Sequence, residues 1–245
     1  MEVRSLYREP ARPATPIEWA ALECHDVFKI FRSGPVETVA LRGLDLRIER
    51  GEFVAVLGPS GSGKSTFLHL AAGLDQASAG EIRALGRSLG LLTERELAAY
   101  RARQVALVFQ SDNLWTNLTA AENVIVSLRL AGSATAGQAE AREALGAFGL
   151  GARGPHRPRA LSGGEQQRVA IAAAAARKAP LVLADEPTGE LDTASERLVV
   201  DALLRLRDDF GSTVIVVTHS ARLAEAADRV VELRDGRLHL HPNAA

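Results

Sequence analysis

The feature that most constrains the fold is a glycine-rich loop directly after an apolar run. Phe53–Leu57 is unbroken and apolar between Gly51 and Gly58, as is typical of a strand buried on both faces of a parallel sheet. The loop fits the pattern G-x-x-x-x-G-K-[ST], whose backbone N–H groups and following helix N-terminus surround phosphate oxygens. Its residues are Gly58, Pro59, Ser60, Gly61, Ser62, Gly63, Lys64, Ser65 and Thr66. We expect a nucleoside triphosphate here, with Lys64 at its β- and γ-phosphates and Ser65 on Mg²⁺.

The rest of the chain alternates short apolar runs with helix-like stretches, which predicts an α/β fold with a largely parallel sheet. The other expected strands are Leu22–Ile30, Val39–Leu41, Leu44–Ile48, Val105–Phe109, Leu181–Ala184 and Thr213–Val217. The expected helices are Lys64–Ala72, Glu122–Leu130, Gly137–Phe148, Glu165–Ala176 and Ser195–Arg207. Ser111–Ala160 contains no good strand, so we expect a helical subdomain at about 111–165. Arg229–Leu240 predicts a hairpin that turns at Asp235–Gly236.

Composition narrows the class of protein. The 245 residues are 47% hydrophobic and 24% charged, enough to bury a sizeable core. A net charge of -1, without a block of lysine and arginine, argues against nucleic acid as the main partner. The single cysteine, Cys24, excludes an intrachain disulfide and is interpreted as a small buried residue near a strand.

The ends of the chain and its hydropathy suggest how it is organised. Residues 1–20 contain Pro10, Pro13 and Pro16 and predict a flexible tail, followed by one domain from 21 to 245. No stretch approaches the roughly 20 apolar residues that cross a bilayer. If the protein works at a membrane, we therefore expect another chain to span it.

Polar residues follow three other apolar runs. Leu181–Ala184 leads into Asp185 and Glu186, and strand ends in such sheets are where ligands bind. Asp185 is suited to hold Mg²⁺ and Glu186 to polarise the attacking water. Gln110 is expected at the metal and its water, and His219 at the γ-phosphate. The alternative interpretation is that these are ordinary solvated residues at strand ends.

Leu161–Arg168 reads Leu-Ser-Gly-Gly-Glu-Gln-Gln-Arg. Ser162 is a good N-terminal helix cap, and two following glycines expose backbone N–H groups, which predicts a second anion-binding helix end. The candidate ATP contacts here are Ser162, Gly163, Gly164 and Glu165. This segment resembles the signature of the ABC-transporter ATPases, and it lies shortly before the strand that ends at Asp185, as it does in that family.

The resemblance covers about Leu22–Leu240. It implies the P-loop NTPase fold of ABC ATPases: a mostly parallel core sheet, an antiparallel β subdomain and a helical subdomain. It also implies Mg²⁺-dependent ATP hydrolysis by two copies paired head to tail, each signature covering the ATP of the other copy. Gln110 then matches the Q-loop, Gly189–Asp192 the D-loop and His219 the switch histidine. Phe31 lies near the position where the family stacks an aromatic ring on adenine; alternatively it is a core residue.

Among ABC ATPases, the chain is most similar to the LolD/MacB type of lipoprotein-release and efflux ATPases, on residues 36–41, 109–124 and 183–189. Those relatives work with a separate integral membrane permease, which implies a peripheral position on the cytoplasmic face of the membrane. We expect Ser111–Val124 to form part of the docking surface. The alternatives are an FtsE-like ATPase that signals without transport, an importer ATPase, and a soluble ABC ATPase acting on DNA or the ribosome. A single phosphate loop and the lack of a heptad run disfavour the last.

Three positions depart from the pattern of these relatives. Glu190 stands where asparagine is usual, Ser220 where aspartate is common, and within Ala172–Ala176 an alanine replaces an expected arginine. None is a core catalytic position. We therefore expect ATPase activity to be retained, with an altered dimer interface.

Overall fold

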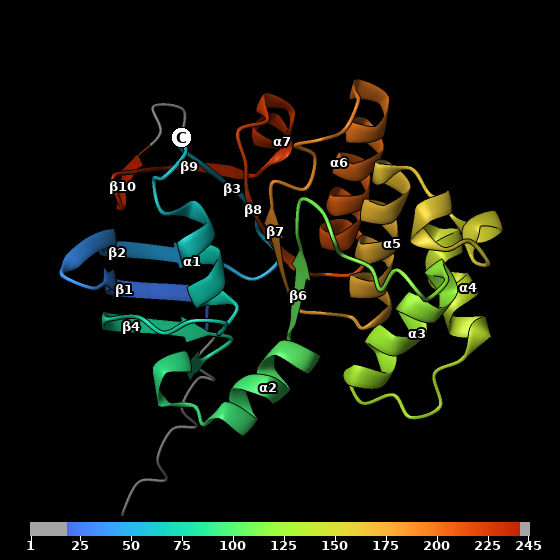
Figure 1. Cartoon of the computed structure of the whole chain (residues 1–245), viewed down its shortest axis with the longest axis horizontal. Coiled ribbons are helices and arrows are strands. Elements are labelled where there is room, and N and C mark those ends of the chain that lie inside the picture. Colours follow the sequence, from blue (N-terminus) through green and yellow to red (C-terminus); the bar gives the residue numbers. More distant parts are fainter. Residues whose placement is uncertain (1–18, 241–245) are drawn as a thin grey trace, which may run out of the picture.

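Five parallel strands form the centre of the molecule in a computed structural model that describes residues 19–240 (Figure 1). The strand order is β10-β9-β3-β8-β7-β6, and only β10 runs antiparallel to its neighbour. The bounds are β3 Phe53–Leu57, β6 Val105–Val108, β7 Leu181–Asp185, β8 Thr213–Val217, β9 Arg229–Arg234 and β10 Arg237–Leu240. The predicted parallel sheet and the hairpin at Asp235–Gly236 are confirmed.

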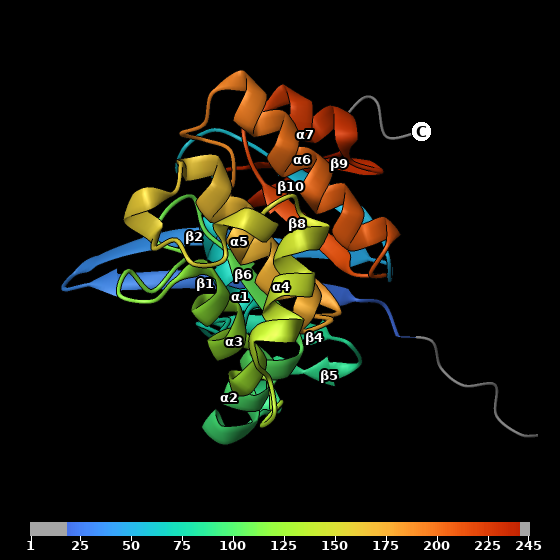
Figure 2. The same ribbon diagram turned by 90° about the vertical axis from the view of Figure 1, so that its right-hand side faces the viewer.

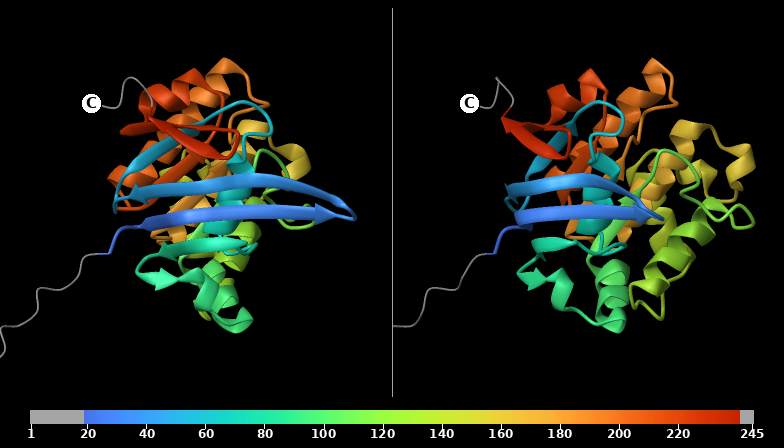
Figure 3. Two further views of the ribbon diagram at one scale, coloured as in Figure 1. Left: turned by 90° about the vertical axis from the view of Figure 1, so that its left-hand side faces the viewer. Right: turned by 60° about the vertical axis from the view of Figure 1, so that its left-hand side comes forward.

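A second, antiparallel sheet lies on one side of the central sheet, in the order β2-β1-β4-β5 (Figure 3). Its strands are β1 Leu22–Ser33, β2 Val36–Ile48, β4 Ala79–Ala84 and β5 Arg87–Ser88. The two short strands predicted at Val39–Leu41 and Leu44–Ile48 are wrong, because β2 continues through Gly43. The pairing with β1 shifts register there, so the irregularity is a bulge inside one strand.

The helices lie mainly on the other side of the central sheet, where α3, α4, α5 and α6 form one packed group (Figure 2). The helix bounds are α1 Lys64–Ala71, α2 Glu94–Arg103, α3 Ala120–Leu130, α4 Gln138–Ala147, α5 Gly163–Ala176, α6 Thr193–Asp208 and α7 Ala221–Ala226. Predicted helix ends differ from these by one or two residues, and neither α2 nor α7 was predicted. The described residues contain no strand between β6 and β7, so the inserted segment is helical as expected. Within residues 19–240 no helix combines the length and hydropathy needed to cross a membrane.

The central strands divide their side chains between two hydrophobic cores. In β8, Val214 and Val216 pack toward the helical group, while Ile215 and Val217 pack toward α1 and the antiparallel sheet. A strand buried on both faces has to be apolar at every position, which explains the unbroken runs in the sequence. Cys24 is buried in β1 as expected.

The expected tail, residues 1–20, lies outside the described residues except for its last two. Ala20 is buried, and the ring of Trp19 lies 4.9 Å from the guanidinium of Arg83. Trp19 and Ala20 therefore pack against the domain.

Candidate functional site

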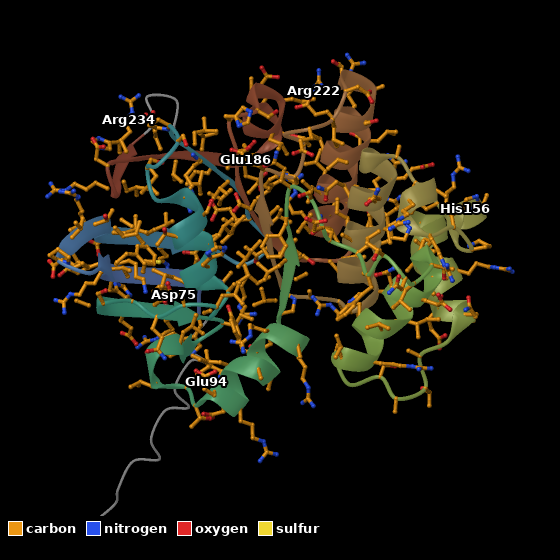
Figure 4. The ribbon with its side chains drawn as sticks, in the orientation of Figure 1. Asp75, Glu94, His156, Glu186, Arg222 and Arg234 are labelled. Atoms are coloured by element: carbon orange, nitrogen blue, oxygen red, sulfur yellow. The ribbon has the colours of Figure 1, made fainter. Side chains whose placement is uncertain are left out.

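The carboxyl ends of the parallel strands surround a cavity of about 660 Å³. Figure 4 labels Glu186 at this edge of the central sheet. The whole predicted phosphate loop, Gly58 to Thr66, lines the cavity, together with Gln110, Asp185, Glu186 and His219. Thr38, Val39 and Ala40 of β2 close it from the antiparallel sheet. Residues from four separate strand ends thus meet at one place, as expected of a parallel sheet.

The phosphate loop is held against its neighbours so closely that two positions accept only glycine. A Cβ on Gly58 would lie 2.1 Å from the carbonyl oxygen of Leu233, and one on Gly63 would lie 2.5 Å from that of Ala40. Both have positive φ, 154° and 103°, which disfavours other residues as well. The loop is therefore fixed as a backbone cradle that leads directly into α1.

Lys64, the first residue of α1, folds its side chain back over this cradle. Its Nζ donates to the carbonyl oxygens of Gly58, at 2.7 Å, and Pro59, at 3.0 Å. The hydroxyl of Ser62 is buried and has no hydrogen-bond partner within the described part of the chain. An ammonium group, backbone donors and an unsatisfied hydroxyl at one helix N-terminus fit a phosphate chain.

Glu186 leaves β7 in a left-handed backbone conformation, with φ 45°. Such a conformation is costly for a residue with a side chain and is concentrated at functional sites. Here it directs the carboxylate toward β8. Oε2 accepts hydrogen bonds from the hydroxyl of Thr218, at 3.1 Å, and the backbone N–H of His219, at 3.3 Å. Oε1 lies 3.0 Å from Nδ1 of His219. Glu186 and His219, two of the four side chains predicted to be catalytic together with Lys64 and Gln110, are thus direct neighbours.

The three expected magnesium ligands line the same cavity. Ser65, Gln110 and Asp185 offer a hydroxyl, a carboxamide and a carboxylate, which are the oxygen donors that Mg²⁺ prefers. The residues present therefore fit the ion. Gln110 also makes a contact that was not predicted, because its amide donates to Oε1 of Glu190 at 3.1 Å.

The signature segment caps α5. The Ser162 hydroxyl accepts from the backbone N–H of Glu165, whose carboxylate accepts from the backbone N–H of Ser162. This second bond lowers the pKa of Glu165, partial burial opposes the shift, and Arg153 adds to it. The predicted cap is confirmed, and the expected exposure of the backbone N–H groups of the two glycines stays a prediction. Gly164 is buried, and a Cβ there would lie 2.8 Å from the Cβ of Ser195 in α6. Among the described residues, none of the signature lines the phosphate cavity.

Phe31 stands beside the cavity on β1. It is 44% exposed, so it is not a core residue, and it pairs across the sheet with Thr38, which lines the cavity. Lys29 Nζ lies 4.8 Å from the centroid of the Phe31 ring. Phe31 itself does not line the cavity in this conformation, so its expected contact with adenine stays a prediction.

The surroundings of two of the three unusual positions, Ser220 and the alanines of Ala172–Ala176, explain the residues found there. The Ser220 hydroxyl donates to Glu196 of α6 at 2.6 Å, where an aspartate would place like charges together. Within Ala172–Ala176, three alanines are buried where α5 packs on the core. The lack of larger side chains thus allows close packing of this helix.

A groove of about 660 Å³ lies outside the cavity, between the end of β6 and helices α3 and α5. Four exposed apolar side chains line it: Leu74, Phe109, Trp115, 65% exposed, and Leu130, 64% exposed. Arg101 and Arg177 also line the groove and donate to backbone carbonyls; within residues 19–240 neither pairs with a carboxylate. The segment Ser111–Val124, expected to dock a partner, contributes four residues to this groove.

Comparison with known proteins identifies similar chains. A family model described as ABC transporter matches residues 41–189. An uncharacterized ABC transporter ATP-binding protein of Thermotoga maritima is 44% identical over 218 residues, covering 89% of this chain and 93% of that protein. The lipoprotein-releasing system ATP-binding protein LolD of Chromohalobacter salexigens is also 44% identical, with 89% and 92% covered. The macrolide export ATP-binding/permease protein MacB of Azoarcus sp. is 42% identical over 95% of this chain, which spans only 36% of MacB.

Solved structures of ATP-binding cassettes have a fold similar to that of this chain. The ATP-binding cassette MJ0796, in a dimeric post-hydrolysis state bound to ADP and Pi, matches with a TM-score of 0.82 and 37% identity. The match covers 89% of this chain and 96% of that one. A further dimeric structure of MJ0796, described as a bacterial ABC transporter cassette, matches equally well.

Proposed function

Because the chain belongs to the ABC transporter family of ATPases, we propose that it is the motor subunit of a LolD/MacB-type exporter, working as a head-to-tail dimer with a separate permease. One observation supports pairing above all. The phosphate loop, Glu186 and His219 line one cavity, whereas the capped helix end at Ser162 lies outside it. A second copy can supply that helix end to the open side of the cavity, so each site is made by two chains.

The residues of the cavity suggest a division of labour in hydrolysis. Lys64 and the loop amides hold the β- and γ-phosphates. Glu186, already held by Thr218 and His219, accepts a hydrogen bond from the attacking water and orients it in line with the γ-phosphorus. The new bond forms between this water and phosphorus as the bond to the leaving ADP oxygen breaks, and the proton of the water passes to Glu186 and from there to the released phosphate. His219 donates to the γ-phosphate oxygens. Mg²⁺, held by Ser65, Asp185 and Gln110, would supply charge neutralisation.

The partner surface is proposed to be the groove lined by Phe109, Trp115 and Leu130. Exposed apolar side chains gathered in one groove are typical of interaction sites. Arg101 and Arg177 add positive charge without carboxylate partners in the described chain, which favours an apolar permease segment with an acidic residue. Docking there would place the chain at the cytoplasmic face of the membrane. LolD and MacB are named for lipoprotein release and macrolide export, so a lipidated or amphipathic cargo is the favoured class.

The test is to isolate the complex from native membranes. A tagged Glu186→Gln variant is incubated with Mg-ATP, purified in mild detergent, and its partners are identified by mass spectrometry. We expect an integral membrane protein with few transmembrane helices at stoichiometric yield. Soluble partners alone would contradict the transporter assignment while leaving the ATPase chemistry intact.

A matched pair of substitutions tests the groove itself. Leu130→Glu places a charge in the groove, and Leu91→Glu places the same charge at another exposed leucine, 85% exposed. We expect only Leu130→Glu to lose the permease, with ATP binding retained in both variants. Equal recovery of the permease would contradict the proposed docking surface. A permease with a large extracytoplasmic domain would favour the exporter; a complex with a solute-binding protein would favour an importer, and one without transport an FtsE-like role.

A further inference from the structure

Gln167 is a buried amide on α5, only 3% exposed, and every hydrogen-bonding group of its side chain is used. Its Nε2 donates to the carbonyl oxygens of Phe109, at 2.8 Å, and Gln110, at 2.6 Å. Its Oε1 accepts from Nδ2 of Asn113 at 2.9 Å. These bonds hold the loop after β6 to a helix from a distant part of the sequence.

Asn113 closes the same network from within the loop. Its Oδ1 accepts from the backbone N–H of Phe109 at 2.7 Å, and its Nδ2 donates to the carbonyl of Phe109 at 2.7 Å. The loop backbone here belongs to no helix or strand, so side chains satisfy groups that a sheet would otherwise satisfy. Two amides thus keep residues 109–113 in one arrangement and attach that arrangement to α5.

Gln167 lies near the N-terminal end of α5, which is the end that carries the signature. Ser162 caps the same helix five residues earlier, and the helix is continuous from Gly163 to Ala176. At the other end of the clamp, the side chain of Gln110 lines the phosphate cavity. Figure 1 shows the chain leaving β6 and passing α5 on its way to α3. The loop that carries Gln110 and the helix that carries the signature are therefore attached directly to each other.

We infer that Gln167 is a positioning residue that couples a chain's own nucleotide site, through Gln110, to the signature it presents to a second copy. The inference deepens the proposed function and rests on its head-to-tail dimer. When Gln110 takes up its place in the occupied site, the Gln167 clamp draws the N-terminal end of α5 into register with the partner's nucleotide. Without the Gln167 clamp, nucleotide still binds, but its binding no longer positions the signature of the same chain.

The test separates this coupling from a merely structural role with a double-mutant cycle. All variants carry Glu186→Gln, and two quantities are measured: the affinity of the monomer for a fluorescent ATP analogue, and dimerisation in Mg-ATP by analytical ultracentrifugation. Gln167→Met removes the amide at constant length. We expect ATP affinity to stay near that of the parent and dimerisation to weaken about tenfold, within the usual range of coupling between sites.

The deciding comparison repeats Gln167→Met in a Gln110→Ala background. Since Gln167 acts through Gln110, its effect there should shrink to about twofold or less. Asn123→Leu is the control: Asn123 is another buried amide that holds a loop, through the carbonyls of Trp115, Leu118 and Thr119, but without contact to Gln110. Its effect should be equal in both backgrounds. An equal loss from Gln167→Met in both backgrounds would overturn the inference and make Gln167 a structural residue only.

Two further experimental outcomes also bear on the inference. If Gln167→Met does not fold, Asn113→Ser breaks the network from the partly buried side and enters the same cycle with the same expectation. If the Glu186→Gln parent binds the ATP analogue yet remains a monomer, the proposed dimer is contradicted. The coupling inferred for Gln167 depends on that dimer and is then contradicted as well. The behaviour of the parent thus distinguishes failure of the proposed function from failure of the inference.

Discussion

Oε1 of Glu186 lies 3.0 Å from Nδ1 of His219, so the carboxylate at the end of β7 and the imidazole at the end of β8 form one unit. Thr218 and the His219 backbone hold the other carboxylate oxygen. A side chain restrained in this way loses little freedom when it orients a water molecule. Hydrolysis should therefore depend on both residues more than nucleotide binding does.

Glu186→Gln and His219→Ala are expected to lower steady-state ATP hydrolysis by about a hundredfold or more, the usual loss for a positioned acid–base group. ATP binding should change far less, because Lys64 and the loop amides hold the β- and γ-phosphates in both variants. Hydrolysis is followed by phosphate release and binding by a fluorescent ATP analogue. His239→Ala, an exposed histidine on β10, is the control. Loss of binding in step with hydrolysis would contradict the assignment.

Glu190→Ala is expected to lower the Mg²⁺ concentration that half-saturates hydrolysis. The Gln110 Nε2 donates to Glu190 and so restrains the side chain whose amide oxygen is proposed to bind the metal. An exposed contact of this kind contributes about 0.5–1 kcal/mol, which corresponds to roughly a two- to fivefold shift. Glu190→Gln keeps an acceptor for the Gln110 amide and should shift the curve less. A shift in the opposite direction for Glu190→Ala would show that Glu190 assists the metal.

Gly164→Ala should destabilise the protein by about 1–3 kcal/mol, the range for overpacking a close contact. The added Cβ meets that of Ser195 at 2.8 Å, where α5 and α6 approach each other. Chemical denaturation gives the free energy of unfolding. Ser195→Gly removes the opposing atom, so the double variant should be more stable than the sum of the two single effects. Strict additivity would mean that the contact does not limit helix packing.

The cap of α5 should make stability depend on pH in a definite direction. The Ser162 N–H lowers the pKa of Glu165 in the folded state, so ionised Glu165 stabilises the fold above its unfolded pKa, about 4.3. That stabilisation is lost as the pH falls through the folded-state pKa. The melting temperatures of wild type and Glu165→Ala should therefore differ at pH 7 and converge once the pH has fallen through the folded-state pKa of Glu165. A difference that grows toward acid would contradict this.

The central sheet and cavity could be predicted because the decisive signals are local. Unbroken apolar runs followed by polar residues predict both the strands and the edge of the sheet at which Lys64, Asp185 and His219 meet. β4 was missed because it is half exposed, so its sequence lacks the apolar run of a central strand. Gln167 was missed for another reason: nothing near it distinguishes a clamp from a surface glutamine, since its partners lie more than fifty residues away. Contacts between segments that are distant in the sequence can be identified only when the fold is known.

A crosslink between two chains tests the head-to-tail pairing most directly. One chain carries Ser60→Cys in the phosphate loop and the other Ala160→Cys, two residues before the signature cap; both positions are exposed. The native Cys24 does not interfere, because burial raises the pKa of its thiol to about 12. With both chains in the Glu186→Gln background and a short bismaleimide, we expect a crosslinked heterodimer that forms with Mg-ATP and is lost with ADP. Equal crosslinking with or without ATP, or none at saturating Mg-ATP, would contradict the head-to-tail motor.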